Sequence, residues 1–187
     1  PDGVYELKET ISPDGYTVSE ETISFEIREG VLVSDNGSDR VVMEDAPSEI
    51  TISKTDIAMK EEIPGAKLIL TLMKANKTQG ADLKAMASDK ISLADESGKK
   101  ITWTSGTEPM VLKGLPDGDY VLEESVAPDG YTITGKMKFT IIDGEIMGAA
   151  SVAPRPEDGR IDSENNRVIM IDKLSEVPIS KVNVAGK

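Results

Sequence analysis

The stretch PDGDYVLEESVAPDGYTI, from Pro116 to Ile133, decides the fold, because a second copy of it opens the chain. The segment PDGVYELKETISPDGYTV, from Pro1 to Val18, matches it without a gap at an offset of 115 residues. Each copy alternates apolar and polar residues between two Pro-Asp-Gly turns, which is the pattern of a β-strand bounded by turns. Repeated β-structure is therefore predicted.

Two further matches extend the repeat and fix its boundaries. RVVMED (40–45) matches RVIMID (167–172), and SEITISK (48–54) matches SEVPISK (175–181), both at an offset of 127 residues. The difference of 12 residues indicates an insertion, which we place in the polar stretch SVAPRPEDGRIDSENN (151–166) and predict to be a surface loop.

These offsets predict a tandem array. Residues 47–173 form one complete domain, residues 1–46 the C-terminal half of a preceding domain, and residues 174–187 the first strand of a following one. Strands with a period of two alternate with Gly- and Pro-rich turns throughout, and a short helix is possible between Gln79 and Lys90. The predicted fold class is all-β, an antiparallel β-sandwich whose strands include EITISK, AKLILTL, KKITWT, DYVLEES, KMKFTII and RVIMID.

The composition excludes several classes of function. The chain of 187 residues has no histidine and no cysteine, which rules out Ser–His and Cys–His catalysis, disulfides and most zinc sites. Its formal net charge of −13 argues against nucleic acid and anionic membranes as partners. No apolar run approaches the roughly 20 residues of a membrane span. Carboxylates, lysines and hydroxyls remain as reactive groups, and no metal site or cofactor is expected.

Three strands each place one ionisable residue on an otherwise apolar face, because alternate residues of a strand point to the same side. Lys54 follows Ile50 and Ile52, Glu124 follows Tyr120 and Leu122, and Asp172 follows Val168 and Met170. The partial repeats keep this arrangement at Glu9, Asp45 and Lys181.

Burying three charges separately would cost several kcal/mol each, so the three side chains are expected to form one cluster. The alternative is that each charge lies near a strand end and reaches water. A buried cluster of this kind suits amide formation: an apolar core favours a neutral, nucleophilic lysine and a protonated aspartic acid that can lose water. Glu124 could carry the proton between them. The reaction would occur once per molecule and require no cofactor.

At these residues the chain resembles the B-type domains of Gram-positive collagen adhesins (Cna B-type) and the related SpaA-like, prealbumin-like pilin domains. YVLEESVAPDGY and YELKETISPDGY resemble the family's E-box, ISKTD and ISKVN its first strand, and VIMIDK and VVMEDA its last strand. The resemblance implies an Ig-like or transthyretin-like sandwich sealed by an intramolecular isopeptide bond. It assigns the promoting glutamate to Glu124 and Glu9, the nucleophilic lysine to Lys54 and Lys181, and the acceptor to Asp172 and Asp45.

The acceptor differs from that of many family members, which use asparagine and release ammonia; an aspartate implies loss of water. The outer repeats are incomplete, since Asp45 has no lysine strand before it and Lys181 has no domain after it. One hypothesis is that the Lys181 strand of one chain docks on residues 1–46 of another.

The resemblance implies a structural stalk module of an adhesin or pilin on the cell wall of a Gram-positive bacterium, and no enzyme beyond single-turnover self-crosslinking. Its partners would be neighbouring repeats, with host ligands bound by other domains. The alternative is an adhesin domain that binds host protein or glycan itself, through a loop such as 150–167. A third reading, a carboxylate-pair enzyme such as a glycosidase, would need an open cleft, whereas alternation places Glu124 and Asp172 inside the sandwich.

Overall fold

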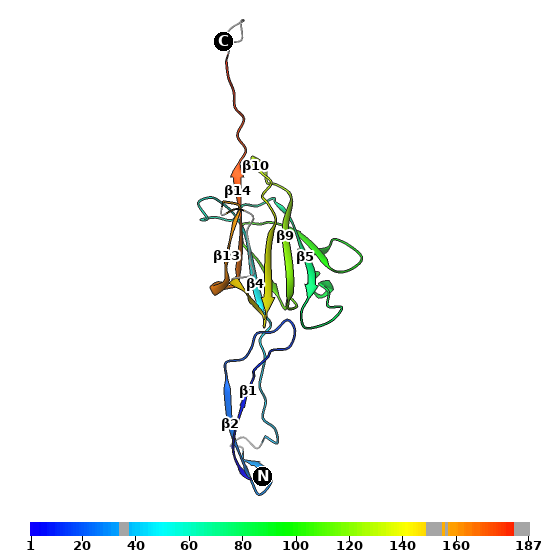
Figure 1. The fold of residues 1–187 in the computed structure, drawn as a ribbon, viewed down its shortest axis with the longest axis vertical. Coiled ribbons are helices and arrows are strands. Elements are labelled where there is room, and N and C mark those ends of the chain that lie inside the picture. The colour runs from blue at the N-terminus through cyan, green and yellow to red at the C-terminus, as the bar shows by residue number, and fades with distance from the viewer. Residues whose placement is uncertain (34–37, 149–154, 156, 182–187) are drawn as a thin grey trace.

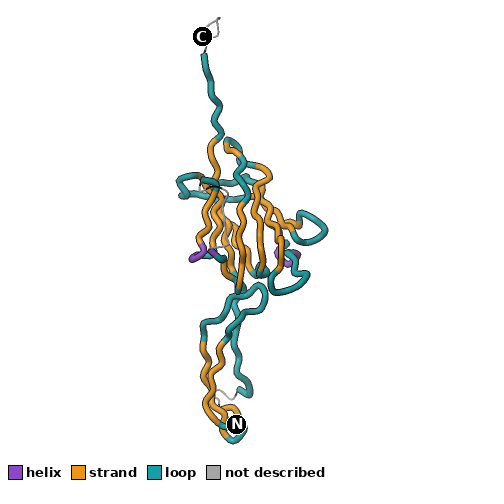
Figure 2. The backbone as a smooth tube through the Cα atoms, viewed as in Figure 1, coloured by secondary structure: helices purple, strands orange, loops and turns teal. Residues whose placement is uncertain are grey.

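The computed structural model describes residues 1–33, 38–148, 155 and 157–181. The molecule is elongated: a β-sandwich occupies the middle, the N-terminal residues form an arm at one end, and the C-terminal segment leaves from the other (Figure 1). Nearly all regular structure is strand (Figure 2). Within the described residues, no helix has the length and apolar character needed to cross a membrane. The predicted all-β class is confirmed.

Two sheets form the sandwich. One is a six-stranded antiparallel sheet in the order β12 (Glu145–Ile146), β11 (Met137–Ile142), β9 (Gly118–Val126), β5 (Lys67–Ala75), β7 (Lys100–Thr104), β6 (Ser92–Leu93). The other has the order β10 (Tyr131–Thr132), β14 (Arg167–Leu174), β4 (Glu49–Asp56), β8 (Met110–Lys113), with β13 (Gly159–Asp162) also paired to β14.

The core lies between these sheets and follows the predicted alternation. Ile50 and Ile52 of β4 face Leu122 of β9 across a single hydrophobic cluster, and all three are at most 2% exposed. Tyr120 stacks on Phe139 with ring centroids 5.3 Å apart. The six quoted strand segments all contain strands, and a short 3-10 helix, Lys84–Met86, lies in the stretch where a helix was considered possible.

Strands β4 and β14, the first and last of the domain, lie side by side and run parallel. They form the only parallel pair among the described strands, since every other ladder is antiparallel. Because β4 begins at one end of the sandwich and β14 finishes at the other, the chain enters and leaves the domain at opposite ends (Figure 1).

Part of the inserted stretch 151–166, which was predicted to be a surface loop, is regular structure; residues 151–154 and 156 lie outside the described residues. Within it, Gly159–Asp162 forms strand β13 and Ser163–Asn165 a 3-10 turn. Strand β13 pairs with β14, and Asp158 and Gly159 are buried. A side chain at Gly159 would bring its Cβ to 2.5 Å from the Met137 sulfur, so the backbone itself packs on the core. Strand β13 has only four residues, which are too few to show the alternation of apolar and polar residues that predicts a strand.

Residues 1–46 contain a separate three-stranded sheet, in the order β1 (Gly3–Lys8), β2 (Thr22–Arg28), β3 (Val31–Val33). It reproduces part of the six-stranded sheet: Tyr5 stacks on Phe25 at 5.5 Å as Tyr120 does on Phe139. The Tyr5 and Tyr120 hydroxyls each donate to the carbonyl of the preceding proline turn, at 2.6 Å in both cases. The described residues thus contain one sandwich domain and an arm with similar local geometry, and the tandem array stays a prediction.

Candidate functional site

The three ionisable residues on apolar faces meet in the core. Lys54 comes from β4 and Asp172 from the neighbouring β14, while Glu124 comes from β9 in the opposite sheet. Their side chains are 1%, 0% and 0% exposed, respectively. The alternative in which each charge reaches water is therefore wrong: the side chains form one buried cluster.

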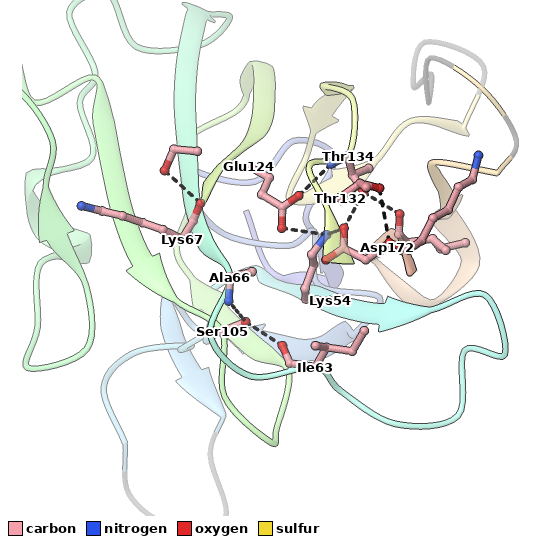
Figure 3. Close-up of polar contacts among 12 residues, drawn as sticks. Lys54, Ile63, Ala66, Lys67, Ser105, Glu124, Thr132, Thr134 and Asp172 are labelled. Atoms are coloured by element: carbon pink, nitrogen blue, oxygen red, sulfur yellow. Dashed lines mark hydrogen bonds and ion pairs between the residues drawn. The ribbon is translucent and has the colours of Figure 1, made fainter. Parts of the chain in front are cut away.

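The lysine ammonium lies between the two carboxylates (Figure 3). Lys54 Nζ donates to Asp172 Oδ1 and lies 3.1 Å from Glu124 Oε1. The parallel register pairs Lys54 with Met170 and Asp56 with Asp172, so the lysine and the aspartate sit two positions apart on adjacent strands. A long lysine side chain can span this offset and bring Nζ to the carboxyl group.

Thr134, which follows β10, holds both carboxylates. Its backbone N–H donates to Glu124 Oε2 at 2.7 Å. Its hydroxyl lies 2.5 Å from Asp172 Oδ1 and 2.6 Å from the carbonyl oxygen of Ile171, and can donate to one of them at a time. Thr134 was not among the predicted site residues. A signal was available, because Ser19 occupies the equivalent position in the first repeat and its N–H donates to Glu9 Oε2 at 2.6 Å.

Burial governs the electrostatics of the cluster. It raises the pKa of Glu124, an effect opposed by the Thr134 N–H and the Lys54 ammonium and reinforced by the Asp172 carboxylate. A carboxyl group that binds its proton more tightly than usual is suited to accept a proton from an ammonium and pass it on. Within the described part of the chain, Asp172 Oδ2 is buried and has no hydrogen-bond partner.

Lys54 is buried, but a small cavity lies beside its side chain. Its backbone N–H donates to Glu62 Oε2 at 2.7 Å, which fixes the strand at this point. A cavity of about 20 Å³ adjoins the side chain, with Trp103 and Leu68 in its wall. A volume of this order is large enough for one water molecule.

The equivalents in the partial repeats do not come together. Glu9 lies in the N-terminal arm, where it accepts from Ser19. Residues 41–46, which include Asp45, are all described and form no strand. Lys181 is exposed at the end of the segment that extends from the opposite end of the domain (Figure 1). The strand expected around Asp45 has no neighbouring lysine strand to pair with.

Comparisons with known proteins agree with this fold. The family model of the SpaA prealbumin-like fold domain matches residues 48–152, which is 105 of the 187 residues. No match was found among curated proteins.

Solved structures that the chain resembles include the pilus adhesin RrgA from Streptococcus pneumoniae, with 19% identity and a TM-score of 0.50 over 74% of this chain and 16% of that one. The Bacillus anthracis TIE protein matches with 22% identity and a TM-score of 0.41 over 93% of this chain and 25% of that one. A C-terminal fragment of the pilus adhesin SpaC from Lactobacillus rhamnosus GG matches with 17% identity and a TM-score of 0.44 over 95% of this chain and 79% of the fragment.

The chain spans less than a fifth of the length of the pilus adhesins RrgA and Cpa, so these similarities concern one module. The match to RrgA, at 19% identity and a TM-score of 0.50, supports the fold alone. The family match covers more than half of the sequence and includes β4 and β9, which carry Lys54 and Glu124, while Asp172 on β14 lies beyond its end. The chain thus belongs to the family of SpaA prealbumin-like fold domains.

Proposed function

We propose that the domain is a structural stalk module of a Gram-positive surface adhesin or pilin, and that an isopeptide bond between Lys54 and Asp172 seals it. The observation that carries the proposal is the contact of Lys54 Nζ with the Asp172 carboxyl group in a buried site that also contains Glu124. The module would be exposed on the cell surface, in a protein anchored to the cell wall.

The bond would form by condensation. Lys54 passes a proton to Glu124 and its neutral Nζ attacks the carboxyl carbon of Asp172. The C–N bond forms, the bond from that carbon to one carboxyl oxygen breaks, and the oxygen leaves as water with protons returned by Glu124. An ammonium and a carboxylate become one neutral amide and one water, so atoms and charge balance. Packing of the two strands supplies the high effective concentration that the step requires.

The position of the bond suits a module under tension. The chain enters through β4 and leaves through β14, at opposite ends of the sandwich (Figure 1). A bond between Lys54 and Asp172 would carry a pulling force from the first strand directly to the last. The residues between them, including both sheets' remaining strands, would be bypassed, so the domain would resist extension without disulfides.

The alternative of direct ligand binding lacks a comparable observation. The loop 150–167 considered for it contains no aromatic residue, and aromatic side chains are common anchors of binding sites. Residues 150–154 and 156 of that loop lie outside the described residues.

Intact mass after denaturation tests the proposal. The chain should be lighter than its calculated mass by one water, and the Lys54→Ala and Glu124→Ala variants should have their full calculated masses. Two control variants change chain neighbours of the cluster: Lys173→Ala next to Asp172 on β14, and Glu123→Ala next to Glu124 on β9. Both should keep the mass deficit. A full calculated mass for the unchanged chain would refute the cross-link and favour the ligand-binding alternative.

A further inference from the structure

The turn Pro-Asp-Gly-Tyr occurs twice, with the same local geometry. In Pro13–Tyr16 and in Pro128–Tyr131, the tyrosine N–H donates to the proline carbonyl at 3.1 Å. Gly15 and Gly130 both have φ of +84°, a conformation that favours glycine. In each case the chain that follows is hydrogen-bonded to the turn, since the Ser48 N–H donates to the Gly15 carbonyl at 2.9 Å and the Ser175 N–H donates to the Gly130 carbonyl at 2.8 Å.

The two turns differ in what covers them. Ser12 and Gly15 of the first turn region are buried, whereas Gly130 is exposed. The first turn lies against the base of the sandwich, at the near end of β9 (Figure 1). The second lies at the opposite end of the sandwich, beside the start of the outgoing segment (Figure 1).

Lys77, which follows β5, connects the base of the domain to Ser12, the residue before the first turn. Its Nζ donates to the Ser12 carbonyl at 2.9 Å and to the Ser12 hydroxyl at 3.1 Å. The same ammonium pairs with Asp117 at 3.0 Å and with Asp143 at 2.6 Å. Asp117 is 1% exposed, and its own backbone N–H donates to Asp14 Oδ1 at 2.6 Å. Lys77 is thus held by two acidic side chains of its own domain while it binds the preceding turn.

Glycines allow the two backbones to approach closely. A Cβ at Gly15 would lie 2.8 Å from the Gly114 carbonyl oxygen, and a Cβ at Gly144 would lie 2.6 Å from the Tyr16 carbonyl oxygen. Both are backbone contacts that a side chain could not displace without moving the chain. The base of the domain therefore contacts the turn region both through close backbone packing and through hydrogen bonds.

We propose that this contact is a repeating joint, in which the base formed by Lys77, Asp117 and Gly144 is the receptor for the turn of the preceding repeat. The second turn, Pro128–Tyr131, in which Asp129 and Gly130 are exposed and Pro128 is buried, would bind the same base on the next copy of the domain in a longer array. The proposal uses the repeat organisation of the proposed function but not its cross-link.

The joint would fix the angle between successive repeats. The covalent connection through residues 46–48 alone would act as a hinge. Lys77 adds a second attachment, to Ser12, and the Asp117–Asp14 hydrogen bond a third. Attachments at separate points resist bending and rotation, so an array of such repeats would be a stiff rod rather than a flexible string.

The test measures the distance distribution between spin labels at Ser24→Cys and Lys138→Cys in the full chain, which has no cysteine of its own. Both positions are exposed strand residues on either side of the joint. We expect one narrow peak. It should be lost in Lys77→Met and kept in Lys74→Met, an exposed lysine on β5 with the same change in charge.

Asp14→Ala provides a second variant that leaves the sandwich intact, because Asp14 lies in the preceding turn. It should also lose the narrow peak. A broad distribution in the unchanged chain, or a narrow peak retained in both Lys77→Met and Asp14→Ala, would overturn the joint.

The second turn is tested by continuing the chain after Lys181 with a second copy of residues 55–173. Ser24 and Lys138 occupy equivalent positions in successive repeats, opposite Glu6 and Val121. Labels at the two copies of Lys138→Cys should therefore give the same narrow distance as the Ser24–Lys138 pair. A broad or different distribution would refute docking of the second turn. The mass deficit is read separately: a deficit with a broad distribution refutes only the joint, and a narrow distribution without a deficit refutes only the cross-link.

Discussion

Replacing Glu124 with glutamine should prevent the cross-link while preserving the shape of the core. A glutamine side chain can still accept the Thr134 N–H that now reaches Glu124 Oε2, but it cannot take a proton from Lys54. The proposed bond would join residues 118 positions apart. For a closed loop of that size, the entropy removed from the unfolded chain corresponds to about 5 kcal/mol at room temperature.

This magnitude predicts a large thermal shift. The domain 47–173 has 127 residues, and an unfolding entropy of about 2.1 cal/mol/K per residue gives roughly 0.27 kcal/mol/K in total. Dividing the lost stability by this entropy gives a Tm lower by roughly 15–20 °C in Glu124→Gln. Differential scanning calorimetry measures the shift, and intact mass on the same sample shows whether the bond is absent.

The matched control is Glu123→Gln on the same strand, whose side chain points away from the core and pairs with Lys136. Its Tm should change by no more than a few degrees, because exposed ion pairs contribute about 0–1 kcal/mol. A Glu124→Gln variant that lacks the bond yet melts within a few degrees of the unchanged chain would refute the loop-closure reasoning. One that keeps the mass deficit would refute the proton-transfer role of Glu124.

Three further outcomes follow from the same geometry. Asp172→Asn should still cross-link but release ammonia, so its mass should equal that of the linked unchanged chain; an uncondensed mass would show that the site requires a carboxylic acid. Thr134→Val removes the hydroxyl that lies 2.5 Å from Asp172 Oδ1 and orients it. Losing a hydrogen bond of about 1.5 kcal/mol should raise the activation free energy by that amount and slow bond formation roughly tenfold. Mass spectrometry at intervals after cell-free synthesis measures the rate, and an unchanged rate would exclude this positioning role. In unlinked Lys54→Met, burial raises the pKa of Glu124, so the folded state binds that proton more tightly than the unfolded state. The stabilising contribution should be complete below the ordinary glutamate pKa and be lost as pH rises through the raised one. Urea titrations from about pH 4, near the ordinary glutamate pKa, to about pH 8 should show this decline, and the double variant Lys54→Met/Glu124→Gln should show less of it; equal slopes would contradict the assignment.

The cluster could be predicted because a strand's period of two places residues on a face without knowledge of the fold. Lys54, Glu124 and Asp172 each continue an apolar series, and the cost of burying three lone charges required them to meet. Their contact in the core agrees with that argument.

Thr134 escaped the same reasoning because it acts partly through its backbone N–H, which any residue would supply at that position. Its role depends on where the chain turns after β10, and alternation says nothing about turns. Strand β13 was missed because its burial comes from pairing with β14, a contact between segments that only the folded chain brings together.

The parallel pairing of β4 and β14 also could not be predicted from the sequence. A period of two reports which face a residue occupies, not which strand lies beside it or in which direction that strand runs. Likewise, Lys77 lies in a loop without periodicity, so nothing local distinguishes it from the other lysines. Its contacts with Ser12 and Asp117 depend on the relative placement of two repeats.

Peptide mapping of the denatured chain locates the proposed bond between Lys54 and Asp172. Trypsin cleaves after lysine and arginine, and a lysine in an amide bond is not cleaved. We expect a branched peptide in which Val41–Lys60, uncut at Lys54, is joined to the segment Val168–Lys173, with fragment masses that place the junction between Lys54 Nζ and the Asp172 side chain. Separate linear peptides, with cleavage after Lys54 and an unmodified Asp172, would contradict it.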